Sequence, residues 1–273
     1  MKSTKGNRLL SRVALPLAGA GVALAMAAGG AQAAPALPAL NPDPMPSSFD
    51  FSDCPALQDG YQAAGSTCIS VVITSGTFSV GNFDQQVTSP IRMTFASQFN
   101  KTTRKITPVF GKLRADKMLI QSGLIFKYGL TSVQAQPEYA GVFDQPTSTD
   151  FKIKIGLKIK LINPVLGNNC YLGSNSNPIT LNLSTGTTNP PAPNTPISGE
   201  AATVVLSQPP LAVRSAKHVD NAFSVPGANG CLFGLGVADW IVNEIAGTPA
   251  AAGKNTMIYN EYIASKPYTA LGS

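Results

Sequence analysis

The most regular pattern in the chain is the alternation of lysine and aliphatic residues in residues 151–161, which read FKIKIGLKIKL. Successive side chains of a β-strand point to opposite faces, so this segment predicts a strand with one apolar face and one basic face. The apolar face is expected to pack into the interior of a sheet protein. The basic face carries Lys152, Lys154, Lys158 and Lys160.

Segments rich in β-branched residues repeat the strand signal along most of the chain, and glycine, proline or polar residues separate them. Short strands at such spacing are typical of β-sandwiches and barrels. The pattern therefore predicts an all-β fold, a single antiparallel β-sandwich or barrel-like domain. The expected strands cover residues 68–81, 89–97, 105–113, 117–130, 150–164, 177–186, 199–210 and 255–265.

One segment near the C-terminus has a helical period instead. In residues 234–249, GLGVADWIVNEIAGTP, the residues Val237, Trp240, Ile241 and Ile245 are spaced like one face of a helix, and a glycine and a proline end the segment. The sequence predicts one short α-helix in the C-terminal region, about three turns long, which packs the only tryptophan against the sheet. A tryptophan that serves as a ligand platform is the alternative.

The first 33 residues have the three parts of a secretory signal peptide. Basic residues come first, an apolar run follows, and small residues end the segment at Ala33. The run is shorter than the roughly 20 apolar residues that span a bilayer, which favours a cleaved signal over a membrane anchor. Residues 34–50 are rich in proline and predict an extended spacer, so the single β-rich domain is expected to cover residues 51–273.

Removal of this leader changes the charge balance of the chain. The whole chain has 20 Lys and Arg against 14 Asp and Glu, a net charge of +6, and four of the basic residues lie in the leader. The remaining chain has 16 basic against 14 acidic residues, a net charge of +2. Binding to nucleic acid usually needs a strong, clustered basic excess, so no nucleic-acid partner is expected.

The cysteines predict disulfides, because an exported chain with an even number of cysteines usually pairs them. Cys54, Cys68, Cys170 and Cys231 allow three pairings, and proximity in the sequence favours Cys54–Cys68 and Cys170–Cys231. The chain has no CxxC motif and only one histidine, so neither a metal site nor a cofactor is expected.

Three longer segments carry a resemblance to known sequences. They are residues 52–81 with SPIRMTFA shortly after them, residues 166–199, which begin LGNNCYLGSNSNP, and residues 221–265, which begin NAFSVPGANGC. Together they resemble a group of uncharacterised secreted proteins of Streptomyces-like actinobacteria. The resemblance implies secretion and a single domain, and it implies neither an activity nor a catalytic residue.

Three interpretations of the four-lysine face remain open. It is the solvated face of a half-buried strand, where lysine also keeps the strand from pairing with another chain. Alternatively it binds acidic cell-wall polymers or another envelope component through their phosphate or carboxylate groups. In the third interpretation it lines the watery lumen of a β-barrel pore in an outer lipid layer. The proline-rich residues 185–199 predict an extended surface loop and a second candidate for partner contact.

The sequence contains no GxSxG, HExxH or P-loop motif. The one histidine, His218, lies two residues from Asp220, which a strand would place on the same face without forming a catalytic triad. Glu138, Asp144 and Asp150 lie in a polar stretch and leave glycoside hydrolysis by two carboxylates as an alternative. We therefore expect a secreted, non-enzymatic binding or structural protein at the cell envelope or exterior, with a pore and a hydrolase of envelope glycans as alternatives.

Overall fold

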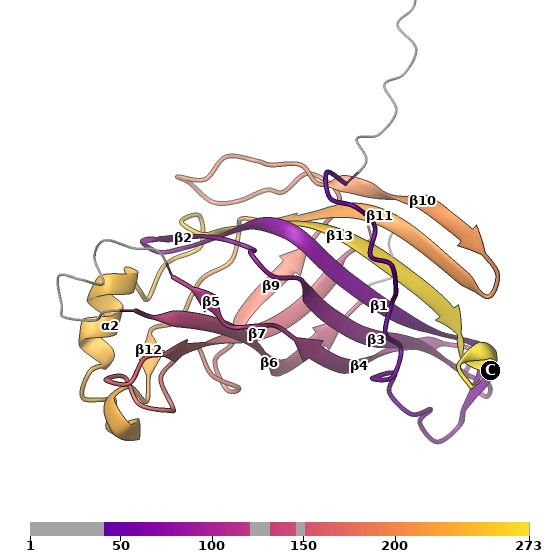
Figure 1. The fold of residues 1–273 in the computed structure, drawn as a ribbon, viewed down its shortest axis with the longest axis horizontal. Helices are drawn as coiled ribbons and strands as arrows, with labels where there is room; N and C mark the ends of the chain where they lie inside the picture. Colours follow the sequence, from indigo (N-terminus) through magenta and orange to yellow (C-terminus); the bar gives the residue numbers. More distant parts are fainter. Residues whose placement is uncertain (1–40, 121–131, 146–150, 273) are drawn as a thin grey trace, which may run out of the picture. The chain divides into compact units, whose positions relative to one another are not determined.

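Two antiparallel β-sheets dominate the computed structural model, which describes residues 41–120, 132–145 and 151–272 (Figure 1). The predicted signal peptide and residues 34–40 lie outside the described residues. Within the described part of the chain, no helix is both long enough and apolar enough to cross a membrane.

Sheet A has seven strands, and its longest strand, β1, lies near the middle. The strands are ordered β10 (Glu200–Gln208), β11 (Leu211–Asp220), β13 (Thr256–Pro267), β1 (Tyr61–Val80), β3 (Ile91–Asn100) and β4 (Ile106–Arg114), and β2 (Phe83–Gln86) pairs with β1.

Sheet B has six strands, and the strand with the lysine alternation, β7, lies at its centre. The strands are ordered β12 (Ala228–Asn229), β8 (Tyr171–Leu172), β7 (Ile153–Ile162), β6 (Gln134–Asp144) and β5 (Met118–Leu119), and β9 (Ile179–Leu183) also pairs with β7.

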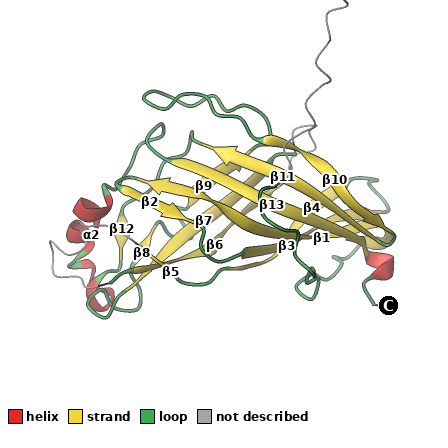
Figure 2. Ribbon diagram, turned by 45° about the horizontal axis from the view of Figure 1, so that its top comes forward, coloured by secondary structure: helices red, strands yellow, loops and turns green. Residues whose placement is uncertain are grey.

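The two sheets share one continuous apolar core, so the predicted β-sandwich is confirmed (Figure 2). All five aliphatic residues of the alternating segment are buried, and the lysines between them are exposed or half-buried. Sheet A contributes the inward-facing side chains of β1 and β3 to the same cluster, among them Val71 and Phe95. Burial of large aliphatic and aromatic side chains contributes about 1.5–3 kcal/mol each, so this shared interior is the main source of stability.

Two strands of nine or more residues, β6 and β11, were not predicted, and neither were the shorter strands β2, β8 and β12. The most consequential is β6, because residues around Glu138 and Asp144 were expected to form a polar loop. The pairing of β6 with β7 is irregular between Tyr139 and Phe143, where Gly141 has a φ of 87°. Such a bulge shifts the inward and outward positions and hides the period of two from the sequence.

Residues 41–57, here called the N-terminal strap, contain neither helix nor strand and lie against sheet A. The side chain of Asn41 donates to the hydroxyl oxygen of Thr74 on β1 at 3.2 Å, and the hydroxyl of Tyr262 on β13 donates to the carbonyl of Asp43 at 2.7 Å. Phe49 and Phe51 pack against a small second apolar cluster that includes Val213, Tyr262 and Ala264. The part of the expected spacer that the structure describes is therefore held to the domain.

The end of the N-terminal strap is fixed to β1 and to β4, the last strand at the other edge of sheet A. The carboxylate of Asp53 accepts two hydrogen bonds from the Arg114 guanidinium on β4, at 2.5 and 2.8 Å. Cys54 forms a disulfide with Cys68 of β1, and Cys170 forms the second with Cys231, as favoured from the sequence. Disulfides persist in oxidising compartments outside the cytoplasm, which fits an exported protein.

The predicted helix exists, but the prediction for Trp240 is wrong. The helix, α2 (Asp239–Ala246), has eight residues, about two turns rather than three. It buries Val242, Ile245 and Ala246, whereas the Trp240 side chain is 66% exposed. Two residues correspond to about 200° around a helix, so burial of Val242 turns Trp240 to the opposite side. The preceding residues form a separate π-helical turn, η1 (Leu232–Gly236).

Loss of either disulfide is expected to lower the free energy of unfolding, and the Cys170–Cys231 bond should contribute more. Its cysteines are 61 residues apart, against 14 for Cys54 and Cys68. Chain entropy alone gives losses of about 4 and about 3 kcal/mol for the paired Cys→Ala variants. Urea unfolding followed by circular dichroism measures both losses, and a reversed order would contradict this explanation.

Candidate functional site: a lysine-lined cleft

The four lysines of the alternating segment, three on β7 and Lys152 directly before it, are divided by the structure into two pairs. Gly156 lies between the pairs, and a Cβ atom there would be 2.8 Å from the Cβ of Val142 on the bulged part of β6. Pro178, just before β9, covers the same point from the other side. Val142 and Pro178 therefore form an apolar barrier between Lys154 and Lys158, and no continuous row of four ammonium groups exists.

The second pair, Lys158 and Lys160, is partly occupied by contacts within sheet B. The Lys158 ammonium lies 3.6 Å from a carboxylate oxygen of Glu138, its cross-strand neighbour on β6. Both ammonium groups also lie over the ring of Tyr171, at 4.9 and 5.9 Å from its centroid. These contacts reduce the attraction of this half of the face for a polyanion, because one of its two charges already has a partner.

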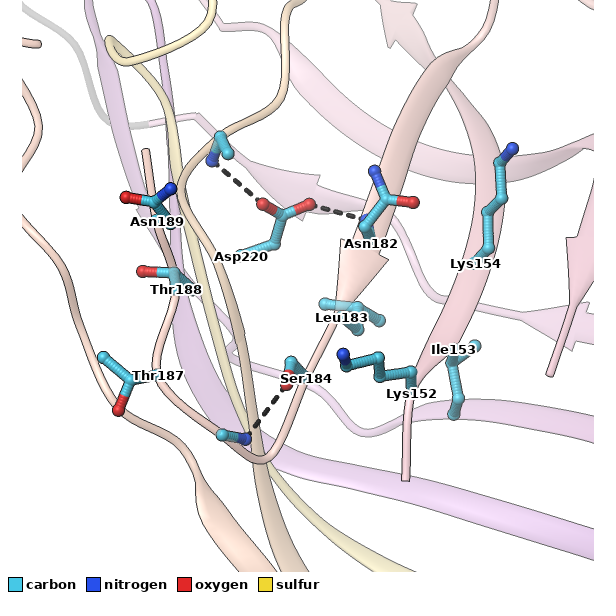
Figure 3. A pocket seen from close by; sticks show the side chains of 12 residues that line it. Lys152, Ile153, Lys154, Asn182, Leu183, Ser184, Thr187, Thr188, Asn189 and Asp220 are labelled. Carbon is cyan, nitrogen blue, oxygen red and sulfur yellow. Dashed lines mark hydrogen bonds between the residues drawn. The ribbon is translucent and has the colours of Figure 1, made fainter. Parts of the chain in front are cut away.

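The first pair, Lys152 and Lys154, borders an open cleft with a volume of about 340 Å³ (Figure 3). Both lysines are exposed. Across from them lies the first part of the proline-rich loop that was predicted as a surface for partner contact. The remaining lining residues come from β7, β9, the loop and the end of β11: Ile153, Asn182, Leu183, Ser184, Gly186, Thr187, Thr188, Asn189, Asp220 and Ala222.

The loop wall of the cleft is held by hydrogen bonds rather than left to fluctuate. Ser184 and Val219 exchange two backbone hydrogen bonds, at 2.9 and 3.0 Å, which join the end of β9 to β11. Thr188 pairs with Ile197 across the loop through its backbone N–H at 2.9 Å and its hydroxyl at 3.2 Å. A wall fixed in this way loses little conformational entropy when a ligand binds.

Asp220 closes the floor between β9 and β11. One of its carboxylate oxygens accepts from the backbone N–H of Asn182 at 2.6 Å, and the other accepts from that of Ala222 at 2.9 Å (Figure 3). Burial raises the pKa of this carboxyl, and the two backbone hydrogen bonds partly oppose the rise. Because both oxygens are engaged, Asp220 holds the cleft in shape and is poorly placed to act as a base.

The exposed groups of the cleft are two ammonium groups together with neutral amides and hydroxyls. Asn182, Thr187 and Asn189 are exposed, and each offers a hydrogen-bonding side chain beside the lysines. The hydroxyl of Ser184 accepts from the backbone N–H of Gly186 at 3.0 Å. Ammonium groups bind phosphate or carboxylate, and amides and hydroxyls match the hydroxyls of sugars or polyols.

His218, the only candidate for a histidine base, is fully buried behind this cleft. Its Nδ1 lies 2.6 Å from a carboxylate oxygen of Glu261, and its Nε2 lies 2.7 Å from the carbonyl oxygen of Phe151. The carbonyl oxygen can only accept, so Nε2 carries a proton, and an ionised Glu261 carboxylate accepts from Nδ1 of a protonated ring. Burial by itself lowers the pKa of His218, but the Glu261 charge and the two hydrogen bonds outweigh it and raise the pKa above its ordinary value.

The His218 contact anchors the start of β7 and so supports the cleft. Phe151 directly precedes Lys152, and its φ of 42° is unusual for a residue with a side chain. The hydrogen bond from His218 on sheet A holds this backbone in place, next to the point where the two lysines emerge. His218 is therefore a positioning residue for the cleft rather than a catalytic base.

The other acidic residues considered from the sequence do not join the cleft. Glu138 and Asp144 lie on β6, opposite Lys158 and Lys154, and Asp150 lies outside the described residues. Among the residues that the structure describes, no group of three or more His, Cys, Asp or Glu side chains is arranged to hold a metal ion.

Comparisons with protein-family models, with curated proteins and with solved structures found no match to this chain. The case for a function therefore rests on the cleft and on the sequence features around it.

Replacement of His218 by glutamine is expected to lower the free energy of unfolding by about 3–5 kcal/mol, because Glu261 would stay buried without its counter-charge. The wild-type contribution should be complete below the unfolded-state pKa of about 6.5 and decline by about 1.4 kcal/mol per pH unit as the pH rises through the raised folded-state pKa. Urea unfolding at a series of pH values measures this decline, which should be absent from the His218→Gln, Glu261→Gln double variant because neither titrating group of the pair remains.

The matched control is Lys217→Gln, one residue away in the chain. Lys217 forms a half-exposed ion pair with Glu200 at 3.7 Å, so its loss should cost less than about 1 kcal/mol and leave the pH dependence unchanged. An unaltered decline in the His218→Gln, Glu261→Gln double variant would show that another group titrates in this range.

Proposed function

We propose that this chain is a secreted, non-enzymatic binding protein of the cell envelope or exterior, which holds an acidic, hydroxyl-rich polymer in the cleft of Lys152 and Lys154. The observation that carries the proposal is the chemistry of that cleft. Two exposed lysines line a cleft of about 340 Å³ together with a hydrogen-bonded wall of amides and hydroxyls. This combination suits a ligand that alternates acidic groups with hydroxyl groups.

Features outside the cleft support an extracellular setting. The first 33 residues have the pattern of a secretory signal, and the two disulfides favour an oxidising compartment. The resemblance to secreted proteins of actinobacteria suggests acidic wall polymers as the natural ligands. After removal of the leader the chain has a net charge of only +2, so the molecule as a whole attracts a polyanion weakly. Recognition therefore depends on the positions of the lysines.

The Lys152→Gln, Lys154→Gln double variant is expected to bind a polyanionic polyol three- to tenfold more weakly than the wild type, since each exposed charge contributes roughly 0.2–1 kcal/mol. Polygalacturonate and a poly(glycerol phosphate) serve as the two probes, and isothermal titration at low and high salt measures their affinities. Binding to the wild type should weaken with added salt, and this dependence should be smaller in the double variant.

The matched control removes the same charge from the other side of the Val142–Pro178 barrier. Lys158→Gln with Lys160→Gln should leave the affinity for both probes nearly unchanged. An equal loss in the two double variants would indicate general charge attraction and exclude the cleft as the binding site. If the wild type binds neither probe, the proposed function is wrong.

A further inference from the structure

Large apolar side chains are exposed mainly at one end of sheet B. Eight such side chains in the described residues are strongly exposed, and five of them belong to elements at this end. Leu235 is 76% exposed, Trp240 66% and Val237 58%, all within the segment of η1 and α2. We call the set the apolar tip; it consists of Leu119, Val165, Leu235, Val237 and Trp240.

The elements that carry the apolar tip are joined to one another. The Cys170–Cys231 disulfide links the turn after β7 to η1, and the backbone N–H of Leu232 donates to the carbonyl of Leu166 at 2.8 Å. Ile120 after β5, Leu166 and Ile245 of α2 line one small apolar crevice. Figure 2 shows α2, β12, β8 and β5 together at this end. The five exposed side chains therefore belong to elements that are fixed to one another.

Basic and aromatic side chains accompany the apolar tip. Lys117 is exposed and directly precedes β5. Lys160 lies on β7, two strands away across β6, and the strand register places it nearly level with Lys117. Lys160 lies over the ring of Tyr171, and it makes no ion pair among the described residues. Three acids lie nearby. Asp116, exposed directly before Lys117, lines a hollow that Arg92 and Arg114 also line. Asp239 accepts from the backbone N–H of Cys231 at 2.8 Å, and Glu244 is exposed one turn after Trp240.

We propose that the apolar tip adsorbs to a lipid surface that carries anionic headgroups. Soluble proteins rarely expose several neighbouring large apolar side chains without an interaction partner. Tryptophan and tyrosine favour the boundary between headgroups and acyl chains, where Trp240 and Tyr171 would lie. Lys117 and Lys160 complement anionic headgroups, and each lysine near such a surface contributes to attraction that salt screens. This surface is separate from the cleft and does not depend on the function proposed for it.

The fluorescence of the intact protein tests the proposal directly, because Trp240 is the only tryptophan in the chain. The probes are vesicles of phosphatidylcholine alone and of phosphatidylcholine with phosphatidylglycerol. Anionic vesicles should shift the emission to shorter wavelength, and lipids brominated on their acyl chains should quench it. Unchanged emission with both kinds of vesicle would overturn the proposal.

Vesicle flotation extends the test to variants that lack the fluorophore. Trp240→Ser should reduce the partition coefficient about 10- to 30-fold, the loss expected when roughly 55–80 Å² of tryptophan surface is no longer removed from water. Val237→Ser should give a smaller loss, and Lys117→Gln with Lys160→Gln should weaken binding at low salt only. Glu244→Gln should strengthen binding to anionic vesicles.

Val204→Ser on the edge strand β10 is the matched control, because Val204 is 53% exposed and Val237 is 58% exposed. It should partition like the wild type, and circular dichroism should show that all variants remain folded. If Val204→Ser and Val237→Ser lower partitioning equally, adsorption is not localised to the apolar tip. A different result is that the wild type does not bind vesicles but forms dimers, and that Trp240→Ser abolishes these dimers. The apolar tip would then contact a second copy of the chain, and the lipid proposal would be wrong.

Discussion

The alternation along β7 is the constraint on which the core, the cleft and the apolar tip all depend. Its register is set from both sides, because Lys154 stands opposite Asp144 of β6 and Asn182 of β9. A slip of one residue would turn the aliphatic side chains to solvent and the lysines into the core. The ten residues of β7 extend over about 33 Å, so one strand begins at the cleft and ends beside the apolar tip.

Features that depend on neighbours along the chain could be predicted from the sequence. The period of two along β7 reports burial directly, and the proximity of the cysteines pointed to the pairing that the structure has. β6 could not be recognised, because the bulge at Gly141 interrupts its period. The cleft could be predicted only in parts: its lysines and its loop were both candidates, but they meet only when β9 pairs with β7 and Asp220 joins β9 to β11.

Two predictions about single residues show why local patterns are insufficient. The segment around Trp240 has more apolar residues than one face of an eight-residue helix can bury, and the sequence does not say which remain outside. Packing selected Val242 and Ile245, and Trp240 was left exposed. His218 was considered as a base because it is the only histidine. Its role as an anchor depends on Glu261, which is 43 residues away in the chain and on the neighbouring strand.

The position of β13 in sheet A has a consequence for the order in which the protein can form. β13 lies between β11 and β1, so sheet A consists of two unconnected halves until this last strand inserts between them. The N-terminal strap also needs it, because the hydroxyl that binds Asp43 belongs to Tyr262, 219 residues later. Contacts of such long range make folding slow. A chain that is still being synthesised therefore cannot complete sheet A, and the native state is reached only after β13 has been made.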